Sequence, residues 1–295
     1  MTVLPDTPPR GTQLLRDAMH CARFLRGAAV HSARHDDVYI SSYPRSGTTW
    51  LSLLVHLVQG GEPDFEHISN VVPWYERDLS LGRATAADFA QLASPRVFKS
   101  HLPYAWLPRG ARYVYALRDG RDVLVSYYEF YRSHLDYRGT WPQFFERFLR
   151  GELQYRSWFR HVRDFQRAAG PNVLLVRYED MLRDPGQALH AVARLCERTI
   201  SPERERAILD ATSFAAMKRL EHKFDHAVAE HAANQAERTD DNGVRSVPAG
   251  AFVRSGRSGD HHAQLTAAEQ ERFAHVQRSW RRRYIRELRL ADFLH

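Results

Sequence analysis

One short segment constrains the fold of this chain more than any other: residues 43–50 spell Tyr-Pro-Arg-Ser-Gly-Thr-Thr-Trp. It follows an apolar run at 38–40 and precedes a periodic apolar stretch at 51–58. This pattern predicts a strand, a tight loop and a helix. Backbone N–H groups of such a loop and the positive end of its helix converge on an anion, and the hydroxyls of Thr48 and Thr49 add donors. The segment therefore predicts a phosphate-binding loop.

The segment is not the usual P-loop. That motif, G-x-x-x-x-G-K-[ST], requires a lysine after its second glycine, whereas Gly47 is followed by Thr48. The basic residue is instead Arg45, which lies before the glycine. Considered alone, the octapeptide also fits an N-capped helix after an ordinary turn, because Ser and Thr are good caps and Pro-Arg-Ser-Gly favours turns. Other motifs decide between the two interpretations.

A second segment, residues 96–103, predicts a short strand that runs into a loop at Pro103. It contains Lys99, one of only three lysines among 42 basic residues, and His101 follows two positions later. A lysine kept in an arginine-rich chain is a candidate for a role that a planar guanidinium does not fill. A lone histidine is usually structural, but its position beside this lysine favours a catalytic role.

Two further strands are predicted at 113–117 and 173–178, each followed by a helical stretch. Arg118 lies at the carboxyl end of the first, and Ser126 lies on the helix after it. Ligands bind at the carboxyl ends of parallel strands in open sheets. Strands alternating with helices indicate repeated βαβ units. We therefore predict an α/β fold, a P-loop-like three-layer sandwich with a central parallel sheet flanked by helices.

Length and composition fit this fold. A chain of 295 residues suits one large α/β domain. We expect an N-terminal extension and first helix at 1–36, and a single domain at 37–295. The two cysteines, Cys21 and Cys196, show neither metal-type nor disulfide spacing, which is typical of a reducing compartment.

The same composition excludes several function classes. No apolar stretch approaches the ~18 residues of a membrane span, and the polar, Pro-rich start does not resemble a signal peptide. We therefore expect a cytoplasmic protein with no membrane partner. The net charge of +7 is spread along the chain with acidic residues interleaved, so we expect no nucleic-acid partner. A grouping of His222, Asp225 and His226 on one helical face is a weak metal signal, and no metal is expected.

In this order, the motifs resemble those of the cytosolic sulfotransferases. The resemblance runs from about Val38 to Phe273. It implies an enzyme that takes a sulfuryl group from 3′-phosphoadenosine 5′-phosphosulfate (PAPS). The matching segments and family motifs are residues 43–50 with Y-P-K-S-G-T-T-W, 99–103 with K-T-H-L-P, 178–181 with Y-E-D-M, 212–217 with T-S-F-x-x-M and 252–260 with F-x-R-K-G-x-x-G-D.

The resemblance also implies roles for single residues. His101 would be the general base, and Lys99 and Arg45 would stabilise charge at the reacting group. In the family an Arg and a Ser eight positions apart grip the 3′-phosphate, and Arg118 with Ser126 reproduces that spacing. The residues implied to contact the donor are Arg45, Ser46, Gly47, Thr48, Thr49, Trp50, Arg118, Ser126, Tyr178, Thr212, Phe214, Phe252, Arg254, Ser255 and Gly256.

The chain departs from the family at several positions. Arg45 and Ser255 each stand where the family has a lysine, which puts donor affinity and rate in question. The family's dimer motif, K-x-x-x-T-V-x-x-x-E, is half present: Thr266 and Glu271 match, but the Lys and Val positions differ. We therefore expect either a monomer or a homodimer.

The acceptor is less constrained. Residues 71–76 resemble the family's V-P-x-x-E stretch at the acceptor pocket, and Trp74, Tyr75 and Tyr104 could supply aromatic walls. Such walls suit a small, partly apolar hydroxyl or amine acceptor. Aromatic side chains are as often core residues, so both interpretations stay open. We predict a mobile lid at 221–250 and a C-terminal helix that starts with a capping box at Thr266.

Two alternative functions stay open. A P-loop kinase using ATP and Mg²⁺ is disfavoured by the missing G-K-[ST] and by the lack of an evident acidic cluster for the metal. A non-catalytic nucleotide-binding protein would explain Arg45 and Ser255. Against that reading, Lys99 and His101 are both retained.

Overall fold

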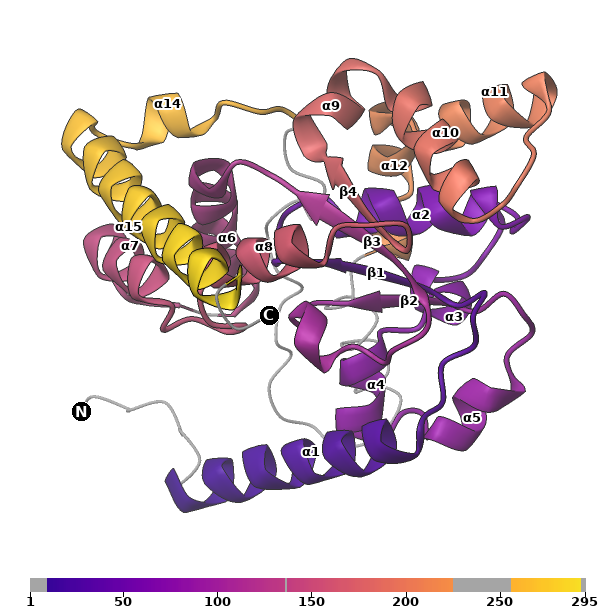
Figure 1. Ribbon diagram of the computed structural model, residues 1–295, viewed down its shortest axis with the longest axis horizontal. Helices are drawn as coiled ribbons and strands as arrows, with labels where there is room; N and C mark the ends of the chain where they lie inside the picture. The colour runs from indigo at the N-terminus through magenta and orange to yellow at the C-terminus, as the bar shows by residue number, and fades with distance from the viewer. Residues whose placement is uncertain (1–9, 136, 225–255, 293–295) are drawn as a thin grey trace, which may run out of the picture.

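The computed structural model describes residues 10–135, 137–224 and 256–292. It contains one parallel sheet with the strand order β2-β1-β3-β4. Helices cover both faces of the sheet, as Figure 1 shows. This is the predicted α/β sandwich with a central parallel sheet. The strands are β1 (Val38–Ser42), β2 (Val97–Ser100), β3 (Arg112–Leu117) and β4 (Val173–Arg177).

The helices and 3₁₀ turns fill the intervals between and after the strands. Their bounds are α1 (Arg10–Val30), α2 (Thr48–Val58), α3 (Ile68–Val71), α4 (Tyr75–Leu81), α5 (Ala86–Gln91), η1 (Tyr104–Trp106), α6 (Gly120–His134), α7 (Trp141–Arg150), α8 (Trp158–Ala168), α9 (Tyr178–Arg183), α10 (Pro185–Leu195), α11 (Pro202–Ala211), α12 (Phe214–Arg219), η2 (Glu221–Lys223), α14 (His261–Gln264) and α15 (Ala267–Asp292).

Alternation along the strands divides the core into an aromatic and an aliphatic half. Because successive strand residues point to opposite faces, Tyr39 and Tyr113 pack on one side while Ile40 and Val114 pack on the other. The aromatic half lies beneath α1, α4, α7 and α8, and the aliphatic half beneath α2, α10 and α11. Both β1 and β2 are buried along their whole length, as expected for parallel strands covered on both faces.

The ends of the chain pack against this body. In α1, Phe24 contacts Tyr75 edge-on with ring centroids 6.2 Å apart, and the helix packs against α4 (Figure 1). The predicted boundary at residue 36 stays a prediction. Helix α15 begins with the predicted capping box, because Thr266 and Glu269 exchange backbone and side-chain hydrogen bonds. None of the helices described has both the length and the apolar character needed to cross a membrane.

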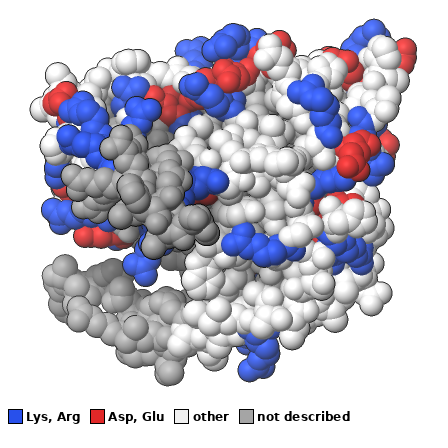
Figure 2. All heavy atoms as spheres, viewed as in Figure 1, with Lys and Arg blue, Asp and Glu red and all other residues white. Residues whose placement is uncertain are grey.

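Charge is mixed on the molecular surface. On the face drawn in Figure 2, Lys and Arg side chains are scattered and lie among Asp and Glu in its upper part. The predicted absence of a nucleic-acid partner stays a prediction.

Candidate active site

The predicted loop at residues 43–47 joins β1 to α2. Gly47 caps the helix with a φ of 96°, in the left-handed region that favours glycine. A Cβ added there would lie 2.7 Å from Cδ2 of Tyr178, so a side chain would strike that ring. Arg45 also has a positive φ, 70°. The chain is therefore tightly curled at the start of a helix, which is an anion-binding arrangement.

Hydroxyl and indole groups line the start of α2. The hydroxyls of Thr48 and Ser42 are buried and hydrogen-bonded to each other. The ring of Trp50 packs edge-on against Tyr178, with centroids 5.8 Å apart. The Nε1 group of Trp50 is buried and finds no hydrogen-bond partner among the described residues. A ligand acceptor at this point would offset the desolvation of that N–H.

Arg118 joins two segments that are far apart in the sequence. Its Nη1 donates to the carbonyl of Arg45 at 3.0 Å, and its Nη2 donates to the carbonyl of Arg257 at 3.1 Å. The guanidinium lies 4.5 Å from the ring centre of Tyr178. Arg118 is 7% exposed, and its Nε is buried with no hydrogen-bond partner within the described ranges. A buried cation with an unused donor suits an anionic ligand.

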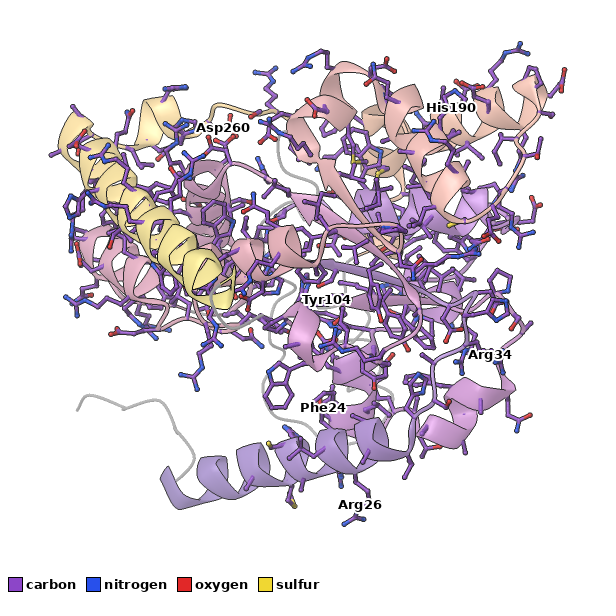
Figure 3. All side chains as sticks on the ribbon, in the orientation of Figure 1. Phe24, Arg26, Arg34, Tyr104, His190 and Asp260 are labelled. Carbon is purple, nitrogen blue, oxygen red and sulfur yellow. The ribbon has the colours of Figure 1, made fainter. Side chains whose placement is uncertain are left out.

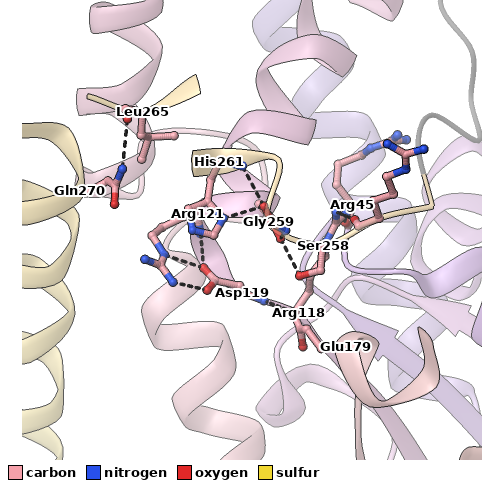
Figure 4. Close-up of polar contacts among 12 residues, drawn as sticks. Arg45, Arg118, Asp119, Arg121, Glu179, Ser258, Gly259, His261, Leu265 and Gln270 are labelled. Carbon is pink, nitrogen blue, oxygen red and sulfur yellow. Dashed lines mark hydrogen bonds and ion pairs between the residues drawn. The ribbon is translucent and has the colours of Figure 1, made fainter. Parts of the chain in front are cut away.

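The side chain of Arg45 lies on α6. Its Nε donates to Oγ of Ser126 at 3.2 Å, and its guanidinium lies 5.1 Å from the ring centre of Phe130. Figure 4 shows Arg45 and Arg118 close together beside the segment that carries Ser258 and Gly259. Arg45 therefore connects the loop to the Ser that is expected, with Arg118, to bind the 3′-phosphate.

The segment after residue 255 closes against these groups. Gly256 has a φ of 59°, and a Cβ there would lie 2.2 Å from Cδ2 of Phe214. Gly256 therefore lies directly on the Phe214 ring. Three residues predicted to bind the donor, Phe252, Arg254 and Ser255, lie outside the described residues, as does most of the predicted lid at 221–250.

The imidazole of His101 is held in one tautomer. Its Nδ1 lies 2.8 Å from the carbonyl oxygen of Ser42. A carbonyl only accepts hydrogen bonds, so Nδ1 carries the hydrogen and Nε2 carries the lone pair of the neutral ring. Burial, followed by the nearby charge of Lys99, lowers the pKa of His101 well below its usual value. The neutral ring is thus available as a base at Nε2.

The backbone of His101 is fixed from both sides. Its N–H donates to Oε1 of Glu76 at 2.8 Å, and Nε1 of Trp74 donates to the same oxygen at 2.7 Å. On the other side, Nε2 of His161 lies 3.0 Å from the His101 carbonyl and therefore donates to it. Nδ1 of His161 then accepts from the hydroxyl of Tyr115 at 2.9 Å. This network orients His101 from three different elements.

Lys99 lies at the carboxyl end of β2, where it is 5% exposed. Its Nζ lies 3.8 Å from the ring centre of Trp74, and the guanidinium of Arg77 lies 4.8 Å from the same ring. Burial and then the charge of Arg77 lower the pKa of Lys99 to about 7. The same indole packs edge-on against His101, with centroids 5.1 Å apart. Lys99 and His101 therefore share one aromatic neighbour.

A sulfotransferase domain family model matches residues 35–284, most of the chain. The chain belongs to the sulfotransferase family. Sulfotransferase 1A1 of Canis lupus familiaris is 32% identical over 295 residues, which cover 92% of this chain and 94% of that protein. The Bos taurus protein of the same name is 33% identical with equal coverage. The class predicted from the motifs, a sulfotransferase, is confirmed.

Solved structures agree with this family. The crystal structure of mouse sulfotransferase SULT7A1 complexed with 3′-phosphoadenosine 5′-phosphate (PAP) superposes with a TM-score of 0.70 at 25% identity, covering 94% of this chain and 95% of that one. A structure of retinol dehydratase with androsterone and PAP gives a TM-score of 0.71 at 21% identity, covering 88% and 85%. At 21% identity, the similarity to retinol dehydratase shows the fold alone.

The three aromatic residues predicted for the acceptor side of this sulfotransferase occupy different surroundings. Trp74 packs against the His101 ring, as described above. Tyr75 is fully buried in the aromatic core, with its ring 5.5 Å from Tyr39. Tyr104, seen in Figure 3, packs edge-on against Tyr113 at 5.1 Å. These placements favour a core role for the two tyrosines.

Tyr178 and Thr212, both predicted at the adenosine, are already engaged within the protein. The ring of Tyr178 lies between Gly47, Trp50 and Arg118, so it supports the loop. The hydroxyl of Thr212 donates to the carbonyl of Ile208 at 2.8 Å.

Sequence reasoning did not single out three neighbours of the base. Glu76 belongs to the recognised V-P-x-x-E stretch, so a signal for it existed. His161 and Tyr155 gave no sequence signal. Tyr155 lies in an irregular segment and has a φ of 66°. Its ring contacts the His101 ring at a centroid distance of 5.2 Å. Among the described residues, no group of three or more His, Cys, Asp or Glu side chains is placed to hold a metal ion.

Proposed function

We propose that this enzyme transfers the sulfuryl group of PAPS to a hydroxyl or amine of a small, partly apolar acceptor, with His101 as the general base. The observation that carries the proposal is the tautomer of His101. Its Nδ1–H is committed to the Ser42 carbonyl, which leaves a basic Nε2 in a buried site beside Lys99. The mouse SULT7A1 complex with PAP supports the choice of donor.

The residues of this chain fit the donor on two observations. The left-handed Gly47 lets the loop curl at the start of α2 with the Tyr178 ring packed against it, and the buried Nε of Arg118 has no partner in the described parts of the chain. The loop and the start of α2 would hold the 5′ side, and Arg118 with Ser126 would hold the 3′-phosphate. PAPS supplies the sulfuryl group and, in the 5′-phosphate of its nucleotide, the leaving group.

In this mechanism His101 accepts, at Nε2, the proton that the acceptor loses as its oxygen or nitrogen bonds to sulfur. Lys99, when protonated, stabilises the negative charge that grows on the oxygen between sulfur and phosphorus as the bond from sulfur to this oxygen breaks. The N–H groups at the start of α2 contribute to the same charge. Glu76 and His161 keep the base in place through its backbone.

The donor is tested first by calorimetric titration with PAP, ADP and Mg-ATP. We expect PAP to bind most tightly and Arg118→Ala to abolish its advantage over ADP, because the cation expected at the 3′-phosphate is lost. Equal or tighter binding of Mg-ATP would instead support the kinase alternative.

The base is tested by His101→Ala with PAPS and a panel of phenols, alcohols and amines. Turnover should fall by roughly 10²-fold or more, with the Kd of PAP almost unchanged. His190→Ala is the matched control, because His190 is a half-exposed histidine on α10 that contacts Glu205 (Figure 3). Undiminished turnover in His101→Ala would remove His101 as the base. PAP binding without turnover of any acceptor by the unmodified enzyme would support the non-catalytic alternative.

Three further expectations stay predictions. A cytoplasmic location, a monomeric or homodimeric state and a requirement for no metal all follow from the sequence reasoning above. Gel filtration at several concentrations addresses the oligomeric state, and assays with and without a chelator address the metal.

A further inference from the structure

One carboxylate holds the glycine-rich segment at residues 256–261 in place. Asp122 lies in the first turn of α6 and is fully buried. Its Oδ2 accepts from the hydroxyl of Ser258 at 3.0 Å and from the N–H of Gly259 at 2.8 Å. Its Oδ1 accepts from the N–H of His261 at 3.1 Å and lies 2.7 Å from that residue's Nδ1. Four donors thus converge on a single side chain, in the region drawn in Figure 4.

This carboxylate lies next to the groups expected at the 3′-phosphate. It precedes Ser126 by four positions, so both side chains project from the same face of α6. The segment that it holds presents the carbonyl of Arg257 to Nη2 of Arg118. The left-handed φ of Gly259, 92°, lets the backbone turn around the carboxylate.

A buried carboxylate beside a phosphate site needs a physical reason, because two anions repel each other. Here the charge of Asp122 is used internally: its four hydrogen bonds satisfy both oxygens. Those bonds hold the pKa of Asp122 at about 2, despite burial, so the group stays ionised at working pH. The same bonds hold a segment of which residues 256–260 carry no helix or strand of their own.

We propose that Asp122 is a positioning residue for recognition of the donor's 3′-phosphate. By fixing residues 256–261 against Arg118 and Ser126, it makes the enzyme discriminate nucleotides that carry a 3′-phosphate from those that do not. His261 contributes two of the hydrogen bonds to Asp122 that fix this segment. This inference rests on the proposed use of PAPS as donor.

The test is calorimetric binding of PAP and of adenosine 5′-phosphate, which lacks the 3′-phosphate, to the full-length protein. In Asp122→Asn an amide NH₂ replaces one acceptor oxygen and faces donors. We expect the affinity for PAP to fall about 10-fold or more, and the affinity for adenosine 5′-phosphate to change less than about 2-fold. The PAP preference should therefore decrease by about the same factor as PAP affinity.

Asp119→Asn is the matched control. Asp119 lies in the same turn, but its carboxylate bonds to Arg121 and not to the segment at 256–261. We expect this variant to keep the preference for PAP. An Asp122→Asn protein that loses affinity for both nucleotides equally, or that keeps the wild-type preference, overturns the proposal.

Variants of His261 keep the test informative if Asp122→Asn does not fold. His261→Leu removes the Nδ1–H donor, whereas the amide N–H of His261→Asn replaces it. We expect the preference for PAP to fall in the leucine variant and to be retained in the asparagine variant, and equal preferences in the two overturn the proposal. If the unmodified enzyme itself does not prefer PAP, the proposed donor is wrong. An unmodified enzyme that prefers PAP, with unaffected variants, rejects the role of Asp122 alone.

Discussion

Strands β1 and β2 have buried ionisable groups at both ends. At the amino ends these groups form an ion pair, whereas at the carboxyl ends burial disfavours their charged forms. At the amino ends, Asp37 and Arg96 are at most 3% exposed and form an ion pair, with Nε of Arg96 2.7 Å from Oδ1 of Asp37. The other nitrogens of this guanidinium donate to the carbonyls of Phe89 at 3.1 Å and Ser32 at 2.8 Å. Each charge is neutralised and hydrogen-bonded within the protein.

At the carboxyl ends, where Lys99 lies three positions after Arg96, burial disfavours the charged forms of the side chains. The pKa of Lys99 is lowered to about 7 and that of His101 falls well below its usual value, both chiefly through burial. Arg118, next to the end of β3, keeps a buried Nε without a hydrogen-bond partner in the described residues. This end of the sheet is arranged for a negatively charged ligand.

The difference separates stability from function within one sheet. The Asp37–Arg96 pair satisfies its own charges and needs no ligand, although removing one partner leaves the other charge buried and unpaired. The buried cations at the carboxyl ends instead lower stability until an anion binds. Substitutions at the two ends should therefore have opposite effects on unfolding.

The largest effect is expected at the amino ends. Asp37→Asn leaves the Arg96 guanidinium buried without its counter-ion, so the free energy of unfolding should fall by about 3–5 kcal/mol. The site is untouched, so the folded fraction should bind PAP as the unmodified protein does. Urea unfolding and calorimetry measure the two quantities. A loss below about 1 kcal/mol would show that this pair is not the structural charge of the sheet.

At the carboxyl ends, Lys99→Met should have the reverse profile. Turnover should drop by about 10²–10³-fold, because the positive charge that stabilises the reacting oxygens of the donor is removed. The free energy of unfolding should rise by roughly 1 kcal/mol, since an isosteric apolar side chain replaces a buried amine. Destabilisation by this substitution would remove the contrast between the two ends.

The pH dependence of stability gives a second measure of Lys99. The folded pKa is about 7 and the ordinary value is 10.5, so between these values the unfolded chain binds more protons. The stability contributed by this group therefore increases as the pH rises from 7 toward 10.5 and is lost as the pH falls through about 7. Comparing urea unfolding at pH 7 and 9, the increase should be smaller in Lys99→Met than in the unmodified protein.

The sequence predicted the parts of the site that are local. A strand, a Gly-containing loop and a helix occur within residues 38–58, so their geometry follows from neighbouring residues. The positions of Lys99 and Arg118 follow from the predicted strands, because carboxyl ends of parallel strands meet at one edge. Arg118 and Ser126 both contact Arg45, in keeping with the eight-residue spacing.

The rest depends on long-range contacts. Glu76 is separated from His101 by 25 positions in the sequence and His161 by 60, yet both hydrogen-bond its backbone. Periodicity along the sequence does not predict such pairs. Aromatic residues present a further ambiguity, because a side chain that faces a pocket and one that faces the core have the same composition. Trp74 and Tyr75 are adjacent, yet one lies beside the base and the other packs in the core.

The smallest expected effect concerns Arg77, which sharpens the description of the carboxyl ends. Its guanidinium is the second cause, after burial, of the low pKa of Lys99. Arg77→Met keeps an unbranched stem near the Trp74 ring but removes the charge, so the pKa of Lys99 should rise by a fraction of a unit. Because Lys99 is proposed to act in its protonated form, the pH above which kcat/KM falls should move upward.

A pH–rate profile of kcat/KM measures this shift, since that ratio reports groups of the free enzyme. Arg109→Met is the matched control: its guanidinium also lies over a ring, 4.6 Å from the centre of Tyr104, but on an exposed side chain. We expect the control profile to match the unmodified enzyme. An unchanged profile in Arg77→Met would mean that burial, without the charge of Arg77, sets the pKa of Lys99, and a downward shift would contradict the assigned effect of that charge. In the first case the carboxyl ends would differ from the amino ends by solvation rather than by neighbouring positive charge.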